Sequence, residues 1–184
     1  LHDALPISFG YAYRAVNSTN KSTITVEPAK VGVRIPTASL AVTKKIESRF
    51  EEDKAQAFTF RLEKEDGANT GKWVSAGGQP YQLMPGTGET ASDGKTAENG
   101  EFTLTNGQTA KFTVLAGRNY RITERDGDGY YVSVREFGGG AGEDTLFDPE
   151  NPPFAVLKNP SDGKSYSCTF TNTRSSFFLP ETGG

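Results

Sequence analysis

Apolar residues alternate with polar residues along most of this chain, in short segments separated by Gly, Asn, Asp and Pro. Leu40 and Val42 begin one such segment, and Phe58, Phe60 and Leu62 form another. Because successive side chains of a β-strand point to opposite faces, these apolar positions define the buried face of a strand. We expect further strands of the same kind at Phe102 and Leu104, Phe112 and Val114, Tyr120 and Ile122, Tyr130 to Val134, Phe154 and Val156, and Cys168 and Phe170.

This pattern, with no amphipathic helical repeat of useful length, predicts an all-β, two-sheet sandwich. Turn residues that tolerate positive φ lie between the segments, at 65–67, 106–107 and 126–129. Two longer stretches, residues 85–100 and 137–153, are rich in Gly and acidic residues, and we expect both to be loops.

The strand pattern also indicates how the chain is divided. An alternating run at 23–26, followed by Pro28 and Pro36, is typical of the last strand of a preceding domain and its linker. The first residues match neither a targeting sequence nor the strand pattern. We therefore expect four parts: a scar or fragment boundary at 1–7, the end of a preceding domain and a linker at 8–37, a sandwich domain at 38–174, and a flexible tail at 175–184.

Composition excludes several classes of function. The 20 basic and 23 acidic residues are mixed along the chain, so no basic stripe predicts nucleic acid as a partner. No apolar run approaches the roughly 20 residues that a membrane-spanning helix needs. Cys168 is the only cysteine and His2 the only histidine, which excludes an intrachain disulfide and most conventional hydrolase chemistry. The acidic loops lack calcium-loop spacing, and we expect no metal and no cofactor.

Three polar residues continue apolar alternations where the pattern predicts core positions. Lys44 follows Leu40 and Val42, Glu124 follows Tyr120 and Ile122, and Asn172 follows Cys168 and Phe170. Burying an unpaired Lys or Glu is costly, so we expect these three side chains to meet. Burial lowers the pKa of a lysine and raises that of a glutamate, so a neutral Lys44 amine could attack the Asn172 amide while Glu124 shuttles protons.

Each of the three positions also has a simpler interpretation. A slip of one residue in the first strand would turn Lys45 inward and leave Lys44 in solvent. Glu124 could instead lie at an exposed strand end and pair with Arg121 or Arg125. Asn172 could merely end a strand.

These residues lie in motifs that resemble the isopeptide-forming Cna B-type and pilin domains of Gram-positive pili and adhesins. The similar motifs are Leu40-Ala41-Val42-Thr43-Lys44, the block from Phe102 to Gln108 that continues through Leu115-Ala116-Gly117 to Tyr120-Arg121-Ile122-Thr123-Glu124, and Phe170-Thr171-Asn172-Thr173. The resemblance implies an Ig-like, prealbumin-like sandwich. It also implies an intramolecular isopeptide bond between Lys44 and Asn172, with Glu124 as the proton shuttle.

The tail ends in a motif that resembles a sortase signal, made of Leu179, Pro180, Glu181, Thr182 and Gly183. A sortase cysteine would attack the Thr182 carbonyl and pass the acyl group to an amine of the peptidoglycan cross-bridge or of a neighbouring pilin subunit. An engineered labelling tag is the alternative interpretation. The resemblances together imply an extracellular, wall-anchored structural module, a pilin subunit or adhesin stalk, that is no enzyme beyond its own single-turnover reaction. The alternative is a wall-anchoring spacer for an enzyme or ligand-binding adhesin domain upstream, and no host ligand is identified.

Overall fold

The computed structural model describes residues 7–8, 30–86 and 90–174. The chain forms two compact units, residues 1–35 and 36–184. In the first unit, β1 (Ile7–Ser8) pairs with β2 (Lys30–Val31) in antiparallel orientation. The strand expected at 23–26 lies outside the described residues.

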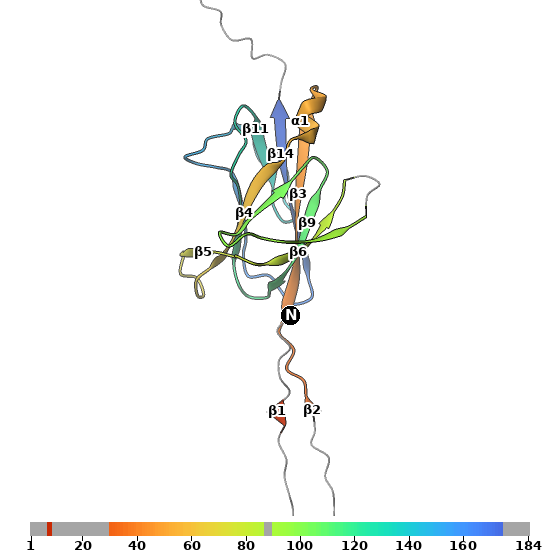
Figure 1. Ribbon diagram of the computed structural model, residues 1–184. Helices are drawn as coiled ribbons and strands as arrows, with labels where there is room; N and C mark the ends of the chain where they lie inside the picture. Colours follow the sequence, from red (N-terminus) through yellow and green to blue (C-terminus); the bar gives the residue numbers. More distant parts are fainter. Residues whose placement is uncertain (1–6, 9–29, 87–89, 175–184) are drawn as a thin grey trace, which may run out of the picture. The chain divides into compact units, whose positions relative to one another are not determined.

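The second unit contains two β-sheets (Figure 1). The larger sheet has seven strands, in the order β12 (Thr145–Leu146), β11 (Tyr131–Arg135), β14 (Ser165–Arg174), β3 (Thr37–Ser48), β9 (Thr109–Leu115), β6 (Pro80–Met84) and β7 (Ser92–Lys95). The smaller sheet has five strands, in the order β13 (Phe154–Leu157), β10 (Tyr120–Glu124), β4 (Phe58–Glu65) and β5 (Trp73–Ser75), with β8 (Glu101–Leu104) also paired to β4. The predicted all-β, two-sheet sandwich is confirmed.

The first and last strands of this unit lie side by side in the larger sheet. β3 and β14 are parallel and paired through ten residues, from Ser39 opposite Ser165 to Ser48 opposite Arg174. The carboxyl ends of β3 and β14 therefore lie at the same end of the sheet, beside the short helix α1 (Glu51–Ala55) (Figure 1). β9 pairs with the other side of β3, so β3 is held by hydrogen bonds along both edges.

Apolar side chains from both sheets fill the space between them. Phe60 lies near its centre, with its ring centroid 5.6 Å from that of Phe102 and 5.2 Å from that of Phe170, while Phe102 and Phe112 are 5.1 Å apart. Edge and offset contacts between aromatic rings add about 0.5–1.5 kcal/mol each to the free energy of burial. The predicted apolar faces of β3, β4, β8, β9, β10 and β14 all contribute to this core.

One predicted strand face was wrong. In β13, Phe154 is 54% exposed, whereas Ala155 and Leu157 are 0% and 2% exposed and point into the core. Residues 154–157 are all apolar, so the sequence lacks the alternation that would determine which face is buried. The register decides it, because Ala155 lies opposite the buried Ile122 of β10.

The connecting segments are partly as predicted. Gly67, Gly107 and Gly129 have φ of 87°, 80° and 81°, as the turn signals indicated. The two expected loops each contain a short strand, however: β7 pairs with β6, and β12 pairs with β11. These strands are only four and two residues long and mostly exposed at the sheet edge, so they carry no apolar alternation that a sequence pattern could detect.

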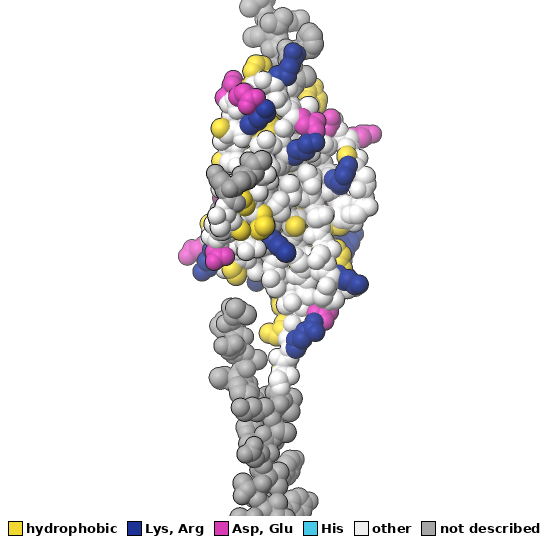
Figure 2. All heavy atoms as spheres, turned by 90° about the vertical axis from the view of Figure 1, so that its right-hand side faces the viewer, with side chains coloured by type: hydrophobic (Ala, Val, Ile, Leu, Met, Phe, Trp, Pro, Cys, Tyr) yellow, Lys and Arg dark blue, Asp and Glu magenta, His cyan; other side chains and the backbone are white. Residues whose placement is uncertain are grey.

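Charged side chains of both signs are interspersed on the face shown in Figure 2. Within the described ranges, no helix is both long and apolar enough to span a bilayer. The same residues contain no cluster of three or more His, Cys, Asp or Glu side chains that could hold a metal ion.

The corrected face of β13 can be tested by two alanine substitutions. Leu157→Ala should lower the free energy of unfolding by about 2–5 kcal/mol, because it removes a buried side chain and leaves a cavity. Phe154→Ala should change it by about 0.5 kcal/mol or less, because the ring is mostly in solvent. Guanidinium denaturation measures both values, and the opposite ranking of the two variants would contradict the register.

Candidate functional site

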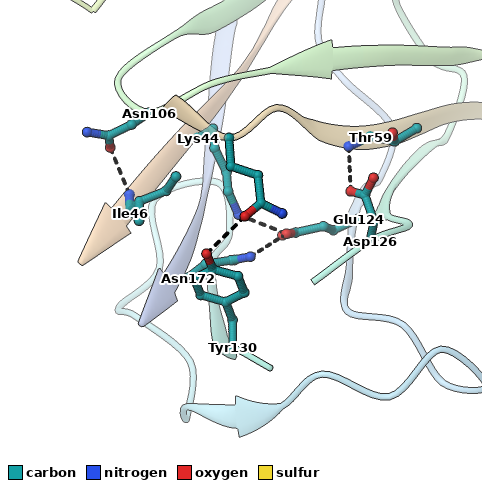
Figure 3. A network of polar contacts seen from close by, with 9 residues as sticks. Lys44, Ile46, Thr59, Asn106, Glu124, Asp126, Tyr130 and Asn172 are labelled. Carbon is teal, nitrogen blue, oxygen red and sulfur yellow. Dashed lines mark hydrogen bonds and ion pairs between the residues drawn. The ribbon is translucent and has the colours of Figure 1, made fainter. Parts of the chain in front are cut away.

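Lys44, Glu124 and Asn172 meet in the core, and all three are 0% exposed. Lys44 Nζ donates a hydrogen bond of 2.8 Å to Glu124 Oε1, and Asn172 Nδ2 donates one of 2.6 Å to the same oxygen. Figure 3 shows the three side chains pointing toward one another. A single carboxylate oxygen therefore contacts both an amine and an amide nitrogen.

Strand register brings these side chains together from both sheets. In the parallel pair of β3 and β14, Lys44 lies opposite Phe170 and Asn172 lies opposite Ile46, so Lys44 and Asn172 are offset by two residues on the inward face. Glu124 is the last residue of β10, in the facing sheet. The site thus joins β3 and β14, the first and last strands of the sandwich along the chain, to the smaller sheet.

Aromatic rings enclose the amine of Lys44. Its Nζ lies 4.1 Å from the centroid of the Phe58 ring and 5.7 Å from that of Phe60. Tyr130 packs edge-on against Phe58, with ring centroids 5.4 Å apart. These rings separate the three polar side chains from water and give them an environment of low polarity, in which electrostatic interactions are strong.

Burial shifts the pKa values of both ionisable groups toward their neutral forms. Loss of hydration lowers the pKa of Lys44 from 10.5 to about 8, although the adjacent Glu124 carboxylate opposes this shift. Burial likewise raises the pKa of Glu124 above its ordinary value, against the opposing effect of Lys44. A less protonated amine is the nucleophilic form of lysine, and a more protonated carboxyl group can donate a proton.

The three side chains do not satisfy one another completely. Glu124 Oε2 and Asn172 Oδ1 are buried, and neither has a hydrogen-bond partner among the described residues. An unpaired buried acceptor costs about 1–3 kcal/mol, so a fold that keeps two of them at one place requires a physical reason. The arrangement is chemically capable of an acyl transfer, since it holds an amine, an amide carbonyl and a proton carrier in contact.

The structure does not match the simpler interpretations of Lys44, Glu124 and Asn172. The side chain of Lys45 points outward, is 57% exposed and has its Nζ 2.5 Å from Glu47 Oε1. Arg121 contacts Glu63 instead of Glu124, with 2.7 Å between Nε and Oε2. Asn172 lies within β14, which continues to Arg174. The sortase-like motif at 179–183 lies outside the described residues.

Sequence reasoning missed a polar cluster, which we call the cap, formed by Ser48, Asp53, Tyr130 and Arg174. Asp53 in α1 is 2% exposed, and its Oδ1 accepts a 2.9 Å hydrogen bond from Arg174 Nη1 at the end of β14. The Ser48 hydroxyl donates to its other oxygen, and the Arg174 guanidinium lies 5.5 Å from the centroid of the Tyr130 ring. No sequence pattern indicates that Asp53 is buried, because this residue lies in the charged run 51–54, which is typical of a solvated surface.

Through Tyr130 the cap adjoins the aromatic wall around Lys44. Although burial by itself raises the pKa of the Asp53 carboxyl group, hydrogen bonds from Ser48 and Tyr130 and the Arg174 guanidinium bring the pKa below its ordinary value. The ionised carboxylate therefore holds the end of β14 against the segment that follows β3.

The sequence matches the model of one protein family, described as a domain of unknown function (DUF7601), over residues 38–151. This match covers more than half of the chain and includes Lys44 and Glu124, but ends before Asn172. No curated protein matches the sequence.

Several solved structures of pilus proteins have a similar fold. The major pilin of Streptococcus pyogenes, in a variant with one asparagine replaced by alanine, has a TM-score of 0.52 and 19% identity, over 86% of this chain and 59% of the pilin. A variant of that pilin with a glutamate replaced by alanine has a TM-score of 0.51 and 19% identity, with the same coverage. A pilus-presented adhesin has a TM-score of 0.51 and 16% identity, over 75% of this chain and 27% of the adhesin.

These similarities concern the fold alone: the sandwich resembles pilin and pilus-adhesin domains. The chain spans about 59% of the pilin's length and a smaller part of the adhesin's.

Removing the charge of Asp53 should weaken the cap. Asp53→Asn should lower the free energy of unfolding at neutral pH by about 1–3 kcal/mol, since a charge-assisted hydrogen bond is lost. Because the folded-state pKa is depressed, the carboxylate stabilises the fold above its ordinary pKa, and this contribution disappears as the pH falls through the folded value. The difference from wild type should therefore shrink at about pH 3.

Guanidinium denaturation at both pH values measures this difference. Glu52→Gln is the matched control, because Glu52 is an exposed acid in the same helix and should have little effect. An equal loss of stability at both pH values would contradict the assigned role of the carboxylate.

Proposed function

We propose that this chain, which belongs to the DUF7601 family, is a structural module of a Gram-positive cell-surface protein, locked by an amide bond between Lys44 and Asn172. It would serve as a pilin subunit or as the stalk of an adhesin. The observation that carries the proposal is the buried contact of Lys44, Glu124 and Asn172 through one carboxylate oxygen. The pilin-like fold of the sandwich supports it.

The contacts support a specific reaction. The neutral Lys44 amine attacks Cγ of Asn172, a bond forms between Nζ and Cγ, and the bond between Cγ and Nδ2 breaks. The proton that Nζ loses passes through Glu124 Oε1 to Nδ2, since that oxygen contacts both nitrogens, and ammonia leaves. No cofactor and no external reactant are needed.

The fold itself supplies the rate enhancement. Holding an amine and an amide together in the core replaces a bimolecular encounter, which is worth about 7–11 kcal/mol when the geometry is good. The pKa of Lys44, lowered by burial to about 8, makes the neutral amine accessible near physiological pH. A proton on Glu124 would also provide the donor that Asn172 Oδ1 lacks, and would polarise the carbonyl for attack.

The position of the bond would determine how the domain carries tension. The chain enters the sandwich through β3 and leaves it through β14, and these strands are parallel neighbours. A force applied at the two ends would pass from β3 to β14 through the amide, so residues 45–171 would carry no load. In the chain-entropy model used for disulfides, closing a loop of this length stabilises the fold by roughly 5 kcal/mol.

The motif at 179–183 supports a proposal of how the module is anchored. We propose that a sortase cleaves after Thr182 and transfers the chain to an amine of the peptidoglycan cross-bridge or of a neighbouring pilin subunit. The module would then be extracellular and covalently attached to the cell wall. The sandwich at 38–174 would stand next to the wall, with the earlier residues 8–37 leading from a preceding domain.

A second candidate function is that of a spacer for a larger surface protein. The similarity to the pilus-presented adhesin covers only 27% of that protein, so a fold of this kind occurs there as a minor part of a longer chain. The present sandwich would then hold an upstream enzyme or ligand-binding domain away from the wall. The complete reading frame distinguishes the two candidates, because repeated copies of the sandwich favour a pilus or stalk.

Intact-protein mass spectrometry tests the cross-link. The folded wild-type chain should be lighter than its sequence mass by one ammonia, whereas Lys44→Ala, Glu124→Ala and Asn172→Ala should have their full sequence masses. These variants should also unfold at lower temperature and be digested faster by proteases, because the covalent constraint is lost.

Lys45→Ala is the matched control, because Lys45 is the exposed neighbour of Lys44 and its removal should leave the ammonia loss intact. Full mass in a folded wild-type sample would refute the cross-link. Loss of ammonia that persists in Lys44→Ala and vanishes in Lys45→Ala would move the bond to Lys45.

A purified sortase tests the anchor. Incubation of the chain with a housekeeping sortase and a glycine-based amine should release the residues after Thr182 and add the amine to the Thr182 carboxyl group. Mass spectrometry detects both products, and a peptide with the same five residues serves as the positive control. An uncleaved chain beside a reactive control peptide would contradict the proposal.

A further inference from the structure

A hollow of about 340 Å³ lies at the outer face of the smaller sheet, away from the buried site. Arg61 of β4, Thr123 of β10 and Arg125 form one part of its lining. Glu150, Asn151 and Phe154, from the segment that leads into β13, form another part. The proposed cross-link uses none of these side chains.

Two arginines of this hollow offer guanidinium donors. Arg61 Nη2 contacts Glu101 at 2.9 Å, but the Arg61 side chain is still 29% exposed, so part of its guanidinium faces the hollow. The Arg125 side chain is exposed, and it lies near enough to the Glu101 carboxylate to help lower the pKa of that group. A carboxylate is the ligand group that such guanidinium donors fit best, because its two oxygens can accept parallel hydrogen bonds.

The opposite wall offers acceptors and an apolar surface. Glu150 supplies a carboxylate, and Asn151 supplies an amide oxygen, since Asn151 Nδ2 already donates to Asp148 Oδ2 at 3.0 Å. The Phe154 ring is 54% exposed, although its neighbours Ala155 and Leu157 are buried. A ligand that fits here must therefore combine one carboxylate, several hydroxyl donors and an apolar face.

We propose that this hollow binds a carboxylated sugar, of the uronic or sialic acid class. The sugar carboxylate would accept hydrogen bonds from Arg61 and Arg125, its hydroxyls would donate to Glu150 and Asn151, and its C–H face would pack on Phe154. The volume lies at the low end of the roughly 300–1,000 Å³ of small-molecule sites, which suits a single sugar unit.

Other ligand classes fit this lining less well. A phosphate or sulfate ion has no hydroxyl donors for Glu150 and no apolar face for Phe154. A neutral sugar would supply no charged acceptor for the two guanidinium groups. An acidic peptide has a carboxylate but lacks the set of hydroxyls that the acceptors on the opposite wall require.

Titration of the ¹⁵N-labelled chain with sodium glucuronate and sodium N-acetylneuraminate tests the proposal. At least one of the two should cause saturable shifts of the backbone amides of Thr123, Arg125 and residues 150–154 that are not prolines, with a Kd on the order of 1 mM. Glucose and acetate should bind about tenfold more weakly or not at all, because each has only part of the required chemistry.

Two substitutions and a control complete the experiment. Arg125→Gln and Phe154→Ala should each weaken binding by about tenfold, whereas Arg135→Gln, in β11 of the other sheet, should leave the affinity unchanged. No saturable shift with either acidic sugar would overturn the proposal. So would equal binding of acetate, equal binding of glucose, or full affinity in both hollow variants. The result is independent of the cross-link, because the hollow and the buried site share no residue.

Discussion

The contact of Lys44 with Glu124 beside Asn172 is the constraint on which the rest of the sandwich depends. It requires β3 and β14 to be neighbours in one register, and it requires the end of β10 to face them from the other sheet. A shift of one residue in any of these strands would turn a charged or amide side chain from the core into solvent. The ten-residue parallel pairing and the aromatic core around Phe60 hold all three strands in place.

The sequence predicted much of this arrangement because strand alternation carries strong information. Lys44 stands between Val42 and Ile46, which are 0% and 6% exposed, so the apolar pattern determines its direction even with Lys45 beside it. Glu124 and Asn172 were found in the same way, each as the polar end of an apolar series. Alternation shows which face a side chain takes, but it does not show which strands are neighbours. The parallel pairing of the first and last strands of the sandwich required the structure.

The features that the sequence did not predict are those with no periodic signal. The apolar run of β13 has no polar positions to mark its outer face, and its register with β10 decides that Ala155 is buried and Phe154 exposed. The strands β7 and β12 are short edge strands whose pairing depends on their neighbours. Asp53 lies in a charged run, and its burial results from the side chains of Ser48 and Arg174, which come from other elements.

Two of the buried acidic groups, Asp53 and Glu124, illustrate why a core would retain charged side chains. Asp53 lies at the end of the sandwich, where Arg174 remains partly in solvent and several donors satisfy the carboxylate, so this pair can stabilise the fold as it stands. Glu124 is different, because both it and Lys44 are without solvent contact, and two acceptor atoms of the site have no partner among the residues that the structure describes. A buried ion pair of this kind is a poor stabiliser compared with packed apolar residues. Our proposal resolves this cost, since amide formation removes the charge of Lys44 and replaces a weak non-covalent contact with a bond between the strands that would bear tension.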